Sequence, residues 1–301
     1  LRLRLRRTLT PLRGTSAAAP AIRAIDPLSA LLLRAVDGRR SMALLLLSHN
    51  LDKYLGGYGR CLRDLDAVVR SPAMASTLID GRRFAAAFSL VRRSSFPDLP
   101  RLIRLSGARR LLDIGSGCGG LLLELAQTDA GFQGWGVEPN PHAVAISRRS
   151  AEELGVSQRI RFFEGSALAL SAALPEEMIA GVEAISGASL LNEFFHGGPT
   201  RAEGLLRDVR RLFPGRLLFV ADYYGRLGHV DEASAEMLHT LVHDLAQAAS
   251  GQGVPPPSEA VWDAIYQSSG CERVGRITGA HNGTGWFIDT LRLVSPESAA
   301  D

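Results

Sequence analysis

The stretch Leu111-Leu-Asp-Ile-Gly-Ser-Gly-Cys-Gly-Gly120 decides the fold of this 301-residue chain. It predicts an apolar strand with Asp113 near its end, then a glycine-dense turn, then a helix that begins close to Leu121. Glycine has no Cβ, so such a turn lets a ligand come close to backbone N–H groups. The glycines fit both a G-x-G-x-G and a G-x-G-x-x-G spacing. The turn alone therefore indicates a nucleotide-like ligand without selecting one.

A second acidic residue follows the turn at the distance expected of a nucleotide site. The apolar strand at 132–137 ends in Glu138, one strand–helix–strand step after the glycines, where the ribose hydroxyls of a bound nucleoside would be held. A nicotinamide-dependent dehydrogenase and an enzyme with an adenosyl ligand both use such an acid. Asp113, in front of the glycines, is less expected of a dehydrogenase.

Together, the stretch from Leu111 to Gly120 and the sequence Gly136-Val-Glu-Pro-Asn140 resemble the first two motifs of the class I S-adenosylmethionine-dependent methyltransferases. The resemblance covers roughly residues 109–222. It implies an α/β fold with a doubly wound, mostly parallel seven-stranded sheet and a C-terminal antiparallel hairpin. It also implies S-adenosylmethionine as the cofactor, with the glycine turn against its methionine part.

The resemblance places the cofactor contacts at the carboxyl ends of the predicted strands. Asp113 would act at the ammonium group of the cofactor, directly or through water, and Glu138 would accept hydrogen bonds from the ribose hydroxyls. Ser166 stands where many members have an Asp that contacts adenine. A role as a helix N-cap is an equal alternative for Ser166. The expected cofactor residues are Asp113, Gly115, Ser116, Gly117, Glu138, Pro139, Asn140, Gly165, Ser166, Ala167 and Ser189.

Strands and helices alternate from residue 109 onward, which favours a parallel sheet with helices on both faces. Asn140 and Pro141 have the properties of an N-cap and a first helical residue, and Gly155 those of a C-cap. Two extended runs near the end of the chain are joined through Asn282-Gly283, which predicts a hairpin. An all-parallel dinucleotide-binding sheet does not need this hairpin. The predicted strands are 110–114, 134–137, 160–164, 182–186, 216–221, 272–277 and 286–294.

The chain divides into three parts. Residues 1–25 are rich in arginine and contain no acidic residue, and we expect a disordered leader there, with a transit-peptide-like segment as the alternative. Residues 26–105 carry apolar residues at helical spacing, and Gly56-Gly57 is expected to break one helix from the next. We expect this part to form a helical cap or dimerisation region. Residues 106–301 form the predicted cofactor-binding domain, with a helical insertion at 231–269.

The candidate catalytic residues follow the fourth and fifth predicted strands. They are Asn192, Glu193, His196 and Tyr223, polar groups in an aromatic setting that suits a small-molecule pocket. Glu193 and His196 are candidate general bases.

A metal site is a further hypothesis. His239 and His243 lie one helical turn apart, a spacing that suits a divalent metal ion. The favoured interpretation is that they are half-buried or solvated histidines of a helix over the site.

Composition limits the partners and the compartment. The chain has 34 basic and 31 acidic residues, a balance that does not indicate a nucleic-acid partner. The apolar run at 43–47 is too short to cross a membrane. Three widely spaced cysteines favour a reducing compartment, and we expect a cytoplasmic protein.

The expected activity is methyl transfer from S-adenosylmethionine to an O, N or C atom of a small molecule. Three alternatives stay open. They are metal-assisted C-methylation of an α-keto acid-like substrate, an NAD(P)-dependent oxidoreductase, and an inactive methyltransferase-like binding subunit. A homodimer through the N-terminal helices is also expected.

Overall fold

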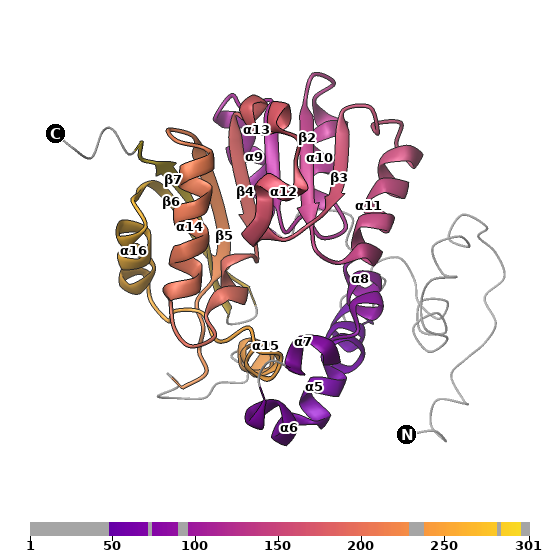
Figure 1. Ribbon diagram of the computed structural model, residues 1–301, viewed down its shortest axis with the longest axis vertical. Helices are drawn as coiled ribbons and strands as arrows, with labels where there is room; N and C mark the ends of the chain where they lie inside the picture. Colours follow the sequence, from indigo (N-terminus) through magenta and orange to yellow (C-terminus); the bar gives the residue numbers. More distant parts are fainter. Residues whose placement is uncertain (1–47, 72–73, 90–95, 229–237, 282–283, 296–301) are drawn as a thin grey trace.

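The computed structural model describes residues 48–71, 74–89, 96–228, 238–281 and 284–295. A seven-stranded sheet has helices on both faces, and a group of N-terminal helices lies at one end of it (Figure 1). The predicted fold class is confirmed. The expected leader at 1–25 lies outside the described residues.

The strand order is β3-β2-β1-β4-β5-β7-β6. The first five strands pair in parallel, and β7 pairs antiparallel with both β5 and β6. The predicted hairpin is therefore confirmed, and its pairing reaches the pair His281↔Thr284, beyond the predicted runs. The strands are β1 Arg110–Ile114, β2 Gln133–Glu138, β3 Ile160–Glu164, β4 Ala184–Ala188, β5 Leu217–Tyr223, β6 Cys271–His281 and β7 Thr284–Leu293.

The sheet is buried on both faces, which explains why its central strands are almost entirely apolar. Successive residues of β1 show this. Leu111 belongs to the hydrophobic cluster that includes residues of α9, α10 and α11, whereas Leu112 belongs to the cluster that includes residues of α12, α13, α14 and α16. The helices of these layers are α9 Leu99–Leu105, α10 Gly120–Thr128, α11 Pro141–Glu153, α12 Leu170–Ala173, α13 Glu176–Gly181, α14 Thr200–Leu212, α15 Leu238–Ala249 and α16 Glu259–Ser268.

Local signals explain most helix ends. Asn140 caps α11 by accepting a hydrogen bond from the His142 N–H, and Gly155 takes the left-handed conformation after the helix, both as predicted. The sequence did not predict α13. Pro175 was expected to end a helix, and it also precedes the next one, because its fixed φ suits a helix start. Because α13 ends at Gly181, β4 begins at Ala184, two residues later than predicted.

The described part of the N-terminal region is helical. Its elements are the π-helix η2 Asp52–Gly57, then α5 Gly59–Arg63, α6 Leu65–Arg70, α7 Ala75–Leu78 and α8 Gly81–Ser89. The predicted break at Gly56-Gly57 is confirmed, since η2 ends at Gly57 and α5 begins at Gly59. Both glycines also serve packing. A Cβ on Gly57 would lie 3.0 Å from the Phe84 ring, and one on Gly56 would lie 2.9 Å from Arg83. Glycine at both positions lets α8 lie against η2.

These N-terminal helices lie with α15 at the end of the sheet where the parallel strands finish (Figure 1). Both α5 and α6 contact α15, and α8 contacts α11. In an open α/β sheet, ligands bind outside the carboxyl ends of the strands, so these helices lie at the end of the sheet where a ligand site is expected.

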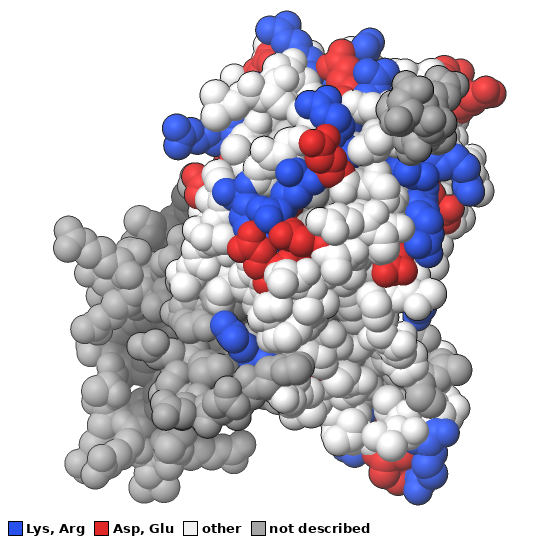
Figure 2. All heavy atoms as spheres, turned by 90° about the vertical axis from the view of Figure 1, so that its left-hand side faces the viewer, with Lys and Arg blue, Asp and Glu red and all other residues white. Residues whose placement is uncertain are grey.

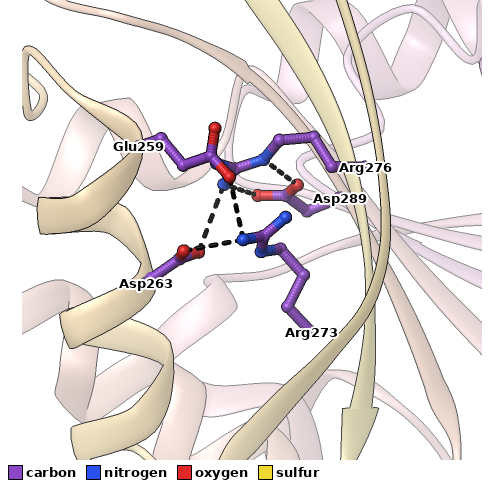
Figure 3. Close-up of polar contacts among 5 residues, drawn as sticks. All are labelled: Glu259, Asp263, Arg273, Arg276 and Asp289. Carbon is purple, nitrogen blue, oxygen red and sulfur yellow. Dashed lines mark hydrogen bonds and ion pairs between the residues drawn. The ribbon is translucent and has the colours of Figure 1, made fainter.

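A charged network joins α16 to the hairpin of β6 and β7 (Figure 3). Arg276 donates two hydrogen bonds of 2.6 Å to Asp289, and its side chain is only 6% exposed. Arg273 reaches Glu259 and Asp263 of α16 at 2.8 and 2.7 Å. The side chains thus join α16, β6 and β7.

On the face shown in Figure 2, basic and acidic side chains are interleaved.

No helix among the described residues is both long and apolar enough to cross a membrane.

Candidate active site

The glycine turn is held by its own neighbours. Gly115, Gly117 and Gly119 have φ values of 71°, 53° and 79°, which favour glycine. The N–H groups of Gly115 and Ser116 both donate to the Val137 carbonyl, at 2.8 and 3.1 Å. The Gly119 N–H donates to the Ser116 carbonyl at 2.9 Å. These backbone donors are therefore already occupied inside the protein.

Glu138 binds the same turn from the end of β2. Its Oε2 accepts a hydrogen bond from the Gly117 N–H, and its Oε1 accepts one from the Asn140 N–H, both at 2.9 Å. Burial raises the pKa of this carboxyl, and the two N–H groups oppose that rise. Each carboxylate oxygen has two lone pairs, so each can still accept one further hydrogen bond. The structure thus presents an oriented carboxylate with free acceptor capacity.

Asp113 lies where the sheet changes its winding direction. The chain runs outward from β1 through β2 and β3, then returns to β4 on the other side of β1. At this switch point, Asp113 accepts a 2.7 Å hydrogen bond from the hydroxyl of Ser186, its register partner on β4. Burial raises the pKa of Asp113 to about 7, against the lowering effect of the Ser186 hydroxyl.

Two residues expected on the adenine side have structural partners. Besides capping α11, Asn140 donates from Nδ2 to the Gly81 carbonyl at 2.8 Å and so holds α8 against the site. Ser166 is exposed and accepts from the Leu168 N–H at 3.2 Å, which is the N-cap role. Pro139 is exposed beside them. Gly165 allows close packing, since a Cβ there would lie 2.5 Å from that of Ala173. Ala167 begins the short 3-10 helix η4 Ala167–Ala169.

The segment after β4 brings two more polar groups to the site. Ser189 is exposed and has a positive φ of 50°, and the 3-10 helix η5 Leu191–Phe194 follows. Asp222, at the end of β5, accepts a 3.1 Å hydrogen bond from the Asn192 N–H. Burial raises the pKa of Asp222 to about 8. The Asn192 side chain is 2% exposed, and its Oδ1 accepts no hydrogen bond from the described residues.

Four carboxyl groups therefore gather at the carboxyl ends of the strands. Asp113 and Glu193 each interact electrostatically with Glu138, and Glu193 also interacts with Asp222. Burial raises the pKa of Glu193 to about 7. His196, by contrast, is exposed.

The remaining predicted residues are Tyr223 at the end of β5 and the two histidines of α15. The Tyr223 hydroxyl donates to Oε1 of Gln247, and the His243 ring lies 5.1 Å from the Tyr223 ring and 6.0 Å from the Tyr54 ring. The side chain of His239 lies outside the described residues. In the described ranges, no group of three His, Cys, Asp or Glu residues is placed to hold a metal ion, so His239 and His243 receive no support as a metal pair.

Lys53 was missed by the sequence analysis. It comes from η2, and its Nζ lies 5.2 Å from the centre of the Tyr54 ring and 5.4 Å from that of Phe88. Burial lowers the pKa of Lys53 to about 8, and the Glu193 carboxylate opposes this change. The N-terminal helices thus add a positively charged side chain to this group of acids.

Comparisons with known proteins agree with this fold. No protein-family model matches the sequence. The uncharacterized protein YjhP of Escherichia coli K12 is 34% identical over 131 residues, which cover 44% of this chain and 48% of YjhP. The match therefore spans about half of that relative.

Two solved structures are similar over most of the chain. The mitomycin 7-O-methyltransferase MmcR has a TM-score of 0.60 at 19% identity, covering 89% of this chain and 75% of its own. PigF, solved with S-adenosylhomocysteine (SAH), has a TM-score of 0.62 at 19% identity. The similarity covers 96% of this chain and 82% of the PigF chain. At these identities the likeness concerns the fold, and the chain has the fold of the class I S-adenosylmethionine-dependent methyltransferases.

Proposed function

We propose that this protein transfers a methyl group from S-adenosylmethionine to a small molecule. The observation that carries the proposal is the pair of carboxylates Asp113 and Glu138 on either side of the glycine turn, at the switch point of a sheet with a methyltransferase strand order. The similarity to MmcR and PigF adds support at the level of the fold.

The residues present fit this cofactor. Glu138 retains acceptor capacity for two ribose hydroxyls, and Asp113 offers a buried carboxylate for the ammonium group. The buried Ser116 hydroxyl has no hydrogen-bond partner in the part of the chain that the structure describes, so it is available to the methionine end. When bound, the cofactor supplies an activated methyl group on a sulfonium, and the protein aligns the acceptor with it.

A dinucleotide cofactor suits the turn less well. Pyrophosphate binding in a dinucleotide fold uses free N–H groups of the glycine turn and the helix start. Here the N–H groups of Gly115, Ser116, Gly117 and Gly119 all donate to protein acceptors. This geometry favours a cofactor that is held by carboxylates.

We assign proton removal from the acceptor to Glu193. Its half-buried carboxyl has a pKa of about 7, which suits a base that works near neutral pH, whereas His196 is exposed to solvent. The backbone N–H groups of Asn192 and Tyr223 both donate to Asp222, and we assign to these two residues the orientation of the acceptor.

Titration calorimetry of the full chain tests the proposal. We expect SAH to bind with a micromolar or lower Kd, and NADH and NADPH to give no heat of binding. Binding of NADH or NADPH without binding of SAH would overturn the proposal and favour an oxidoreductase.

We also propose that two copies associate through the N-terminal helices. Leu55 is 69% exposed and Val69 is 71% exposed, and we assign these two apolar side chains to the interface. Light scattering should give the mass of a dimer for the wild type and of a monomer for the double variant Leu55→Ser, Val69→Ser. A monomeric wild type would contradict this assignment.

A further inference from the structure

Lys53 is the only lysine among the 301 residues, and every other basic residue counted with it is an arginine. The two side chains differ in one property that matters for catalysis. An arginine stays protonated at any pH that a protein experiences, whereas a buried lysine amine can lose its proton near neutral pH. The one lysine of this chain lies at the candidate site, in a helical region that the resemblance does not cover.

The surroundings of Lys53 leave its amine available. Its Nζ lies over the rings of Tyr54 and Phe88, which shield it from water. It makes no hydrogen bond or ion pair with any residue that the structure describes, although its neighbour on η2, Asp52, pairs with Arg83 at 3.8 Å. A half-buried amine therefore keeps three N–H donors for a ligand.

Glu193 is the acidic residue that interacts electrostatically with Lys53. Electrostatic interaction acts between the two groups, yet they do not form a direct ion pair, and the Glu193 carboxylate accepts no hydrogen bond within the described ranges. Lys53 lies on η2, and Glu193 lies on η5 after β4. Gln252 links these two segments. Its side chain accepts a 3.3 Å hydrogen bond from the Tyr58 hydroxyl, next to η2, and its carbonyl accepts a 3.0 Å hydrogen bond from the Phe195 N–H, next to η5. An open donor and an open acceptor thus lie on neighbouring segments that are distant in sequence.

Other charged groups act on this pair. Glu138 from β2 and Asp222 from β5 interact with Glu193, and both carry negative charge when ionised. Burial raises the pKa of Tyr58, which lies between η2 and α5, and the Glu193 carboxylate raises it further. Lys53 is the positive charge in this group of acids, and it favours the ionised form of Glu193.

We propose that Lys53 and Glu193 together bind a phenolic hydroxyl of the acceptor, with Glu193 as the base and Lys53 holding the oxygen as it becomes negative. This assignment rests on the proposed methyl transfer and adds the acceptor class. The Glu193 carboxylate takes the proton of the O–H group, and the electron pair of that bond forms the new O–C bond. The C–S bond breaks with its electron pair on sulfur, which gives SAH. The surrounding rings, Tyr54, Tyr58 and Phe88, suit an aromatic acceptor.

A single lysine makes a direct test practical. Protein labelled with ¹³C-lysine should give one side-chain Cε signal, and its pH titration reports the pKa of Lys53 without interference. We expect a midpoint near 8, and in Glu193→Gln a midpoint lower by roughly 1 pH unit, because the favourable negative charge is lost. The control Glu177→Gln changes an exposed carboxylate of α13 and should leave the midpoint unchanged.

The ligand step uses 4-nitrophenol in the presence of saturating SAH, with 4-nitroanisole as the matched compound that lacks the hydroxyl. We expect 4-nitrophenol to raise the pKa of Lys53, and 4-nitroanisole to leave it unchanged. Lys53→Met should weaken binding of 4-nitrophenol about tenfold, and Lys53→Arg should restore most of it, because arginine keeps the charge.

Two results would overturn the inference. One is a Lys53 midpoint at the ordinary lysine value of about 10.4 that Glu193→Gln does not change. The other is a Lys53 signal that 4-nitrophenol does not perturb in protein that binds SAH. Failure of SAH to bind would instead contradict the proposed function, so the two claims are tested separately.

Discussion

The Gly117 N–H donates a 2.9 Å hydrogen bond to the Glu138 carboxylate, so the glycine turn and the second acid form one structural unit. The other oxygen of Glu138 accepts from the Asn140 N–H, which couples the turn to the start of α11. A carboxylate is needed here because both of its oxygens accept from backbone donors. The same carboxylate is the group that we assign to the ribose hydroxyls.

Glu138→Gln should weaken SAH binding by about 10- to 100-fold. The amide keeps one acceptor oxygen and places an NH2 group against either the Gly117 or the Asn140 N–H, so it disturbs the turn and loses charge-assisted hydrogen bonds of roughly 1.5–3 kcal/mol each. Calorimetry measures the change. The control Glu152→Gln, on an exposed position of α11, should bind like the wild type. A Kd within twofold of the wild type for Glu138→Gln would remove Glu138 from the site.

Asp113→Asn should make the protein more stable and lower its affinity for SAH. The pKa of Asp113 rises from 3.8 to about 7 on folding, so the folded state binds the proton more tightly and wild-type stability falls as pH rises between these values. The variant should therefore match the wild type near pH 4 and unfold roughly 2–5 °C higher at pH 8. Thermal denaturation at both pH values measures this difference.

The same residue predicts a pH dependence of cofactor binding. The wild-type affinity for SAH should fall as pH drops below about 7, because protonated Asp113 cannot pair with the ligand ammonium. Asp113→Asn should bind weakly at every pH. Equal affinity of the wild type at pH 6 and pH 8 would show that Asp113 does not meet the ammonium.

Gly119→Ala should destabilise the fold by about 2–4 kcal/mol. The residue has a φ of 79°, and a Cβ would lie 2.5 Å from the Phe162 ring. The strain of the left-handed backbone and the steric clash therefore both destabilise the variant. Gly155→Ala is the matched control, because its φ is 68° and a Cβ there meets nothing within 4 Å. It should cost about 1 kcal/mol. Urea denaturation compares the two, and equal losses would contradict the packing role of Gly119.

Arg276→Met should destabilise the protein by about 3–5 kcal/mol, because it leaves the fully buried Asp289 carboxylate without its partner. Arg292→Met removes an exposed pair with Glu272 on the same hairpin and should cost less than about 1 kcal/mol. Denaturant unfolding measures both variants. A small loss for Arg276→Met would mean that the network in Figure 3 does not hold α16 to the hairpin.

The sequence predicted the sheet well because each strand is an apolar run bounded by a turn signal. The predicted bounds of β1 and β3 match the structure, and Asn282-Gly283 correctly indicated the hairpin. The main error has a local cause. Pro175 was interpreted only as a helix end, although it also precedes α13. Gly56-Gly57 correctly indicated a break, and both glycines also serve packing against α8.

The candidate site was harder to predict, because neighbours distant in sequence define it. Asp113 and Glu138 lie in the last residues of their strands and could be found from motifs. The pairing of Asp113 with Ser186, 73 residues later, needed the sheet register. Lys53 could not be connected to Glu193 without the folded chain, since they are far apart in sequence. Its status as the only lysine was the one available signal.

The most direct test of the central claim is a crystal structure of the full chain with SAH. The account predicts both ribose hydroxyls within hydrogen-bond distance of the Glu138 carboxylate, and the amino group of the ligand within reach of Asp113. A ligand bound elsewhere on the protein, or with its ribose away from Glu138, would contradict the assignment of this site.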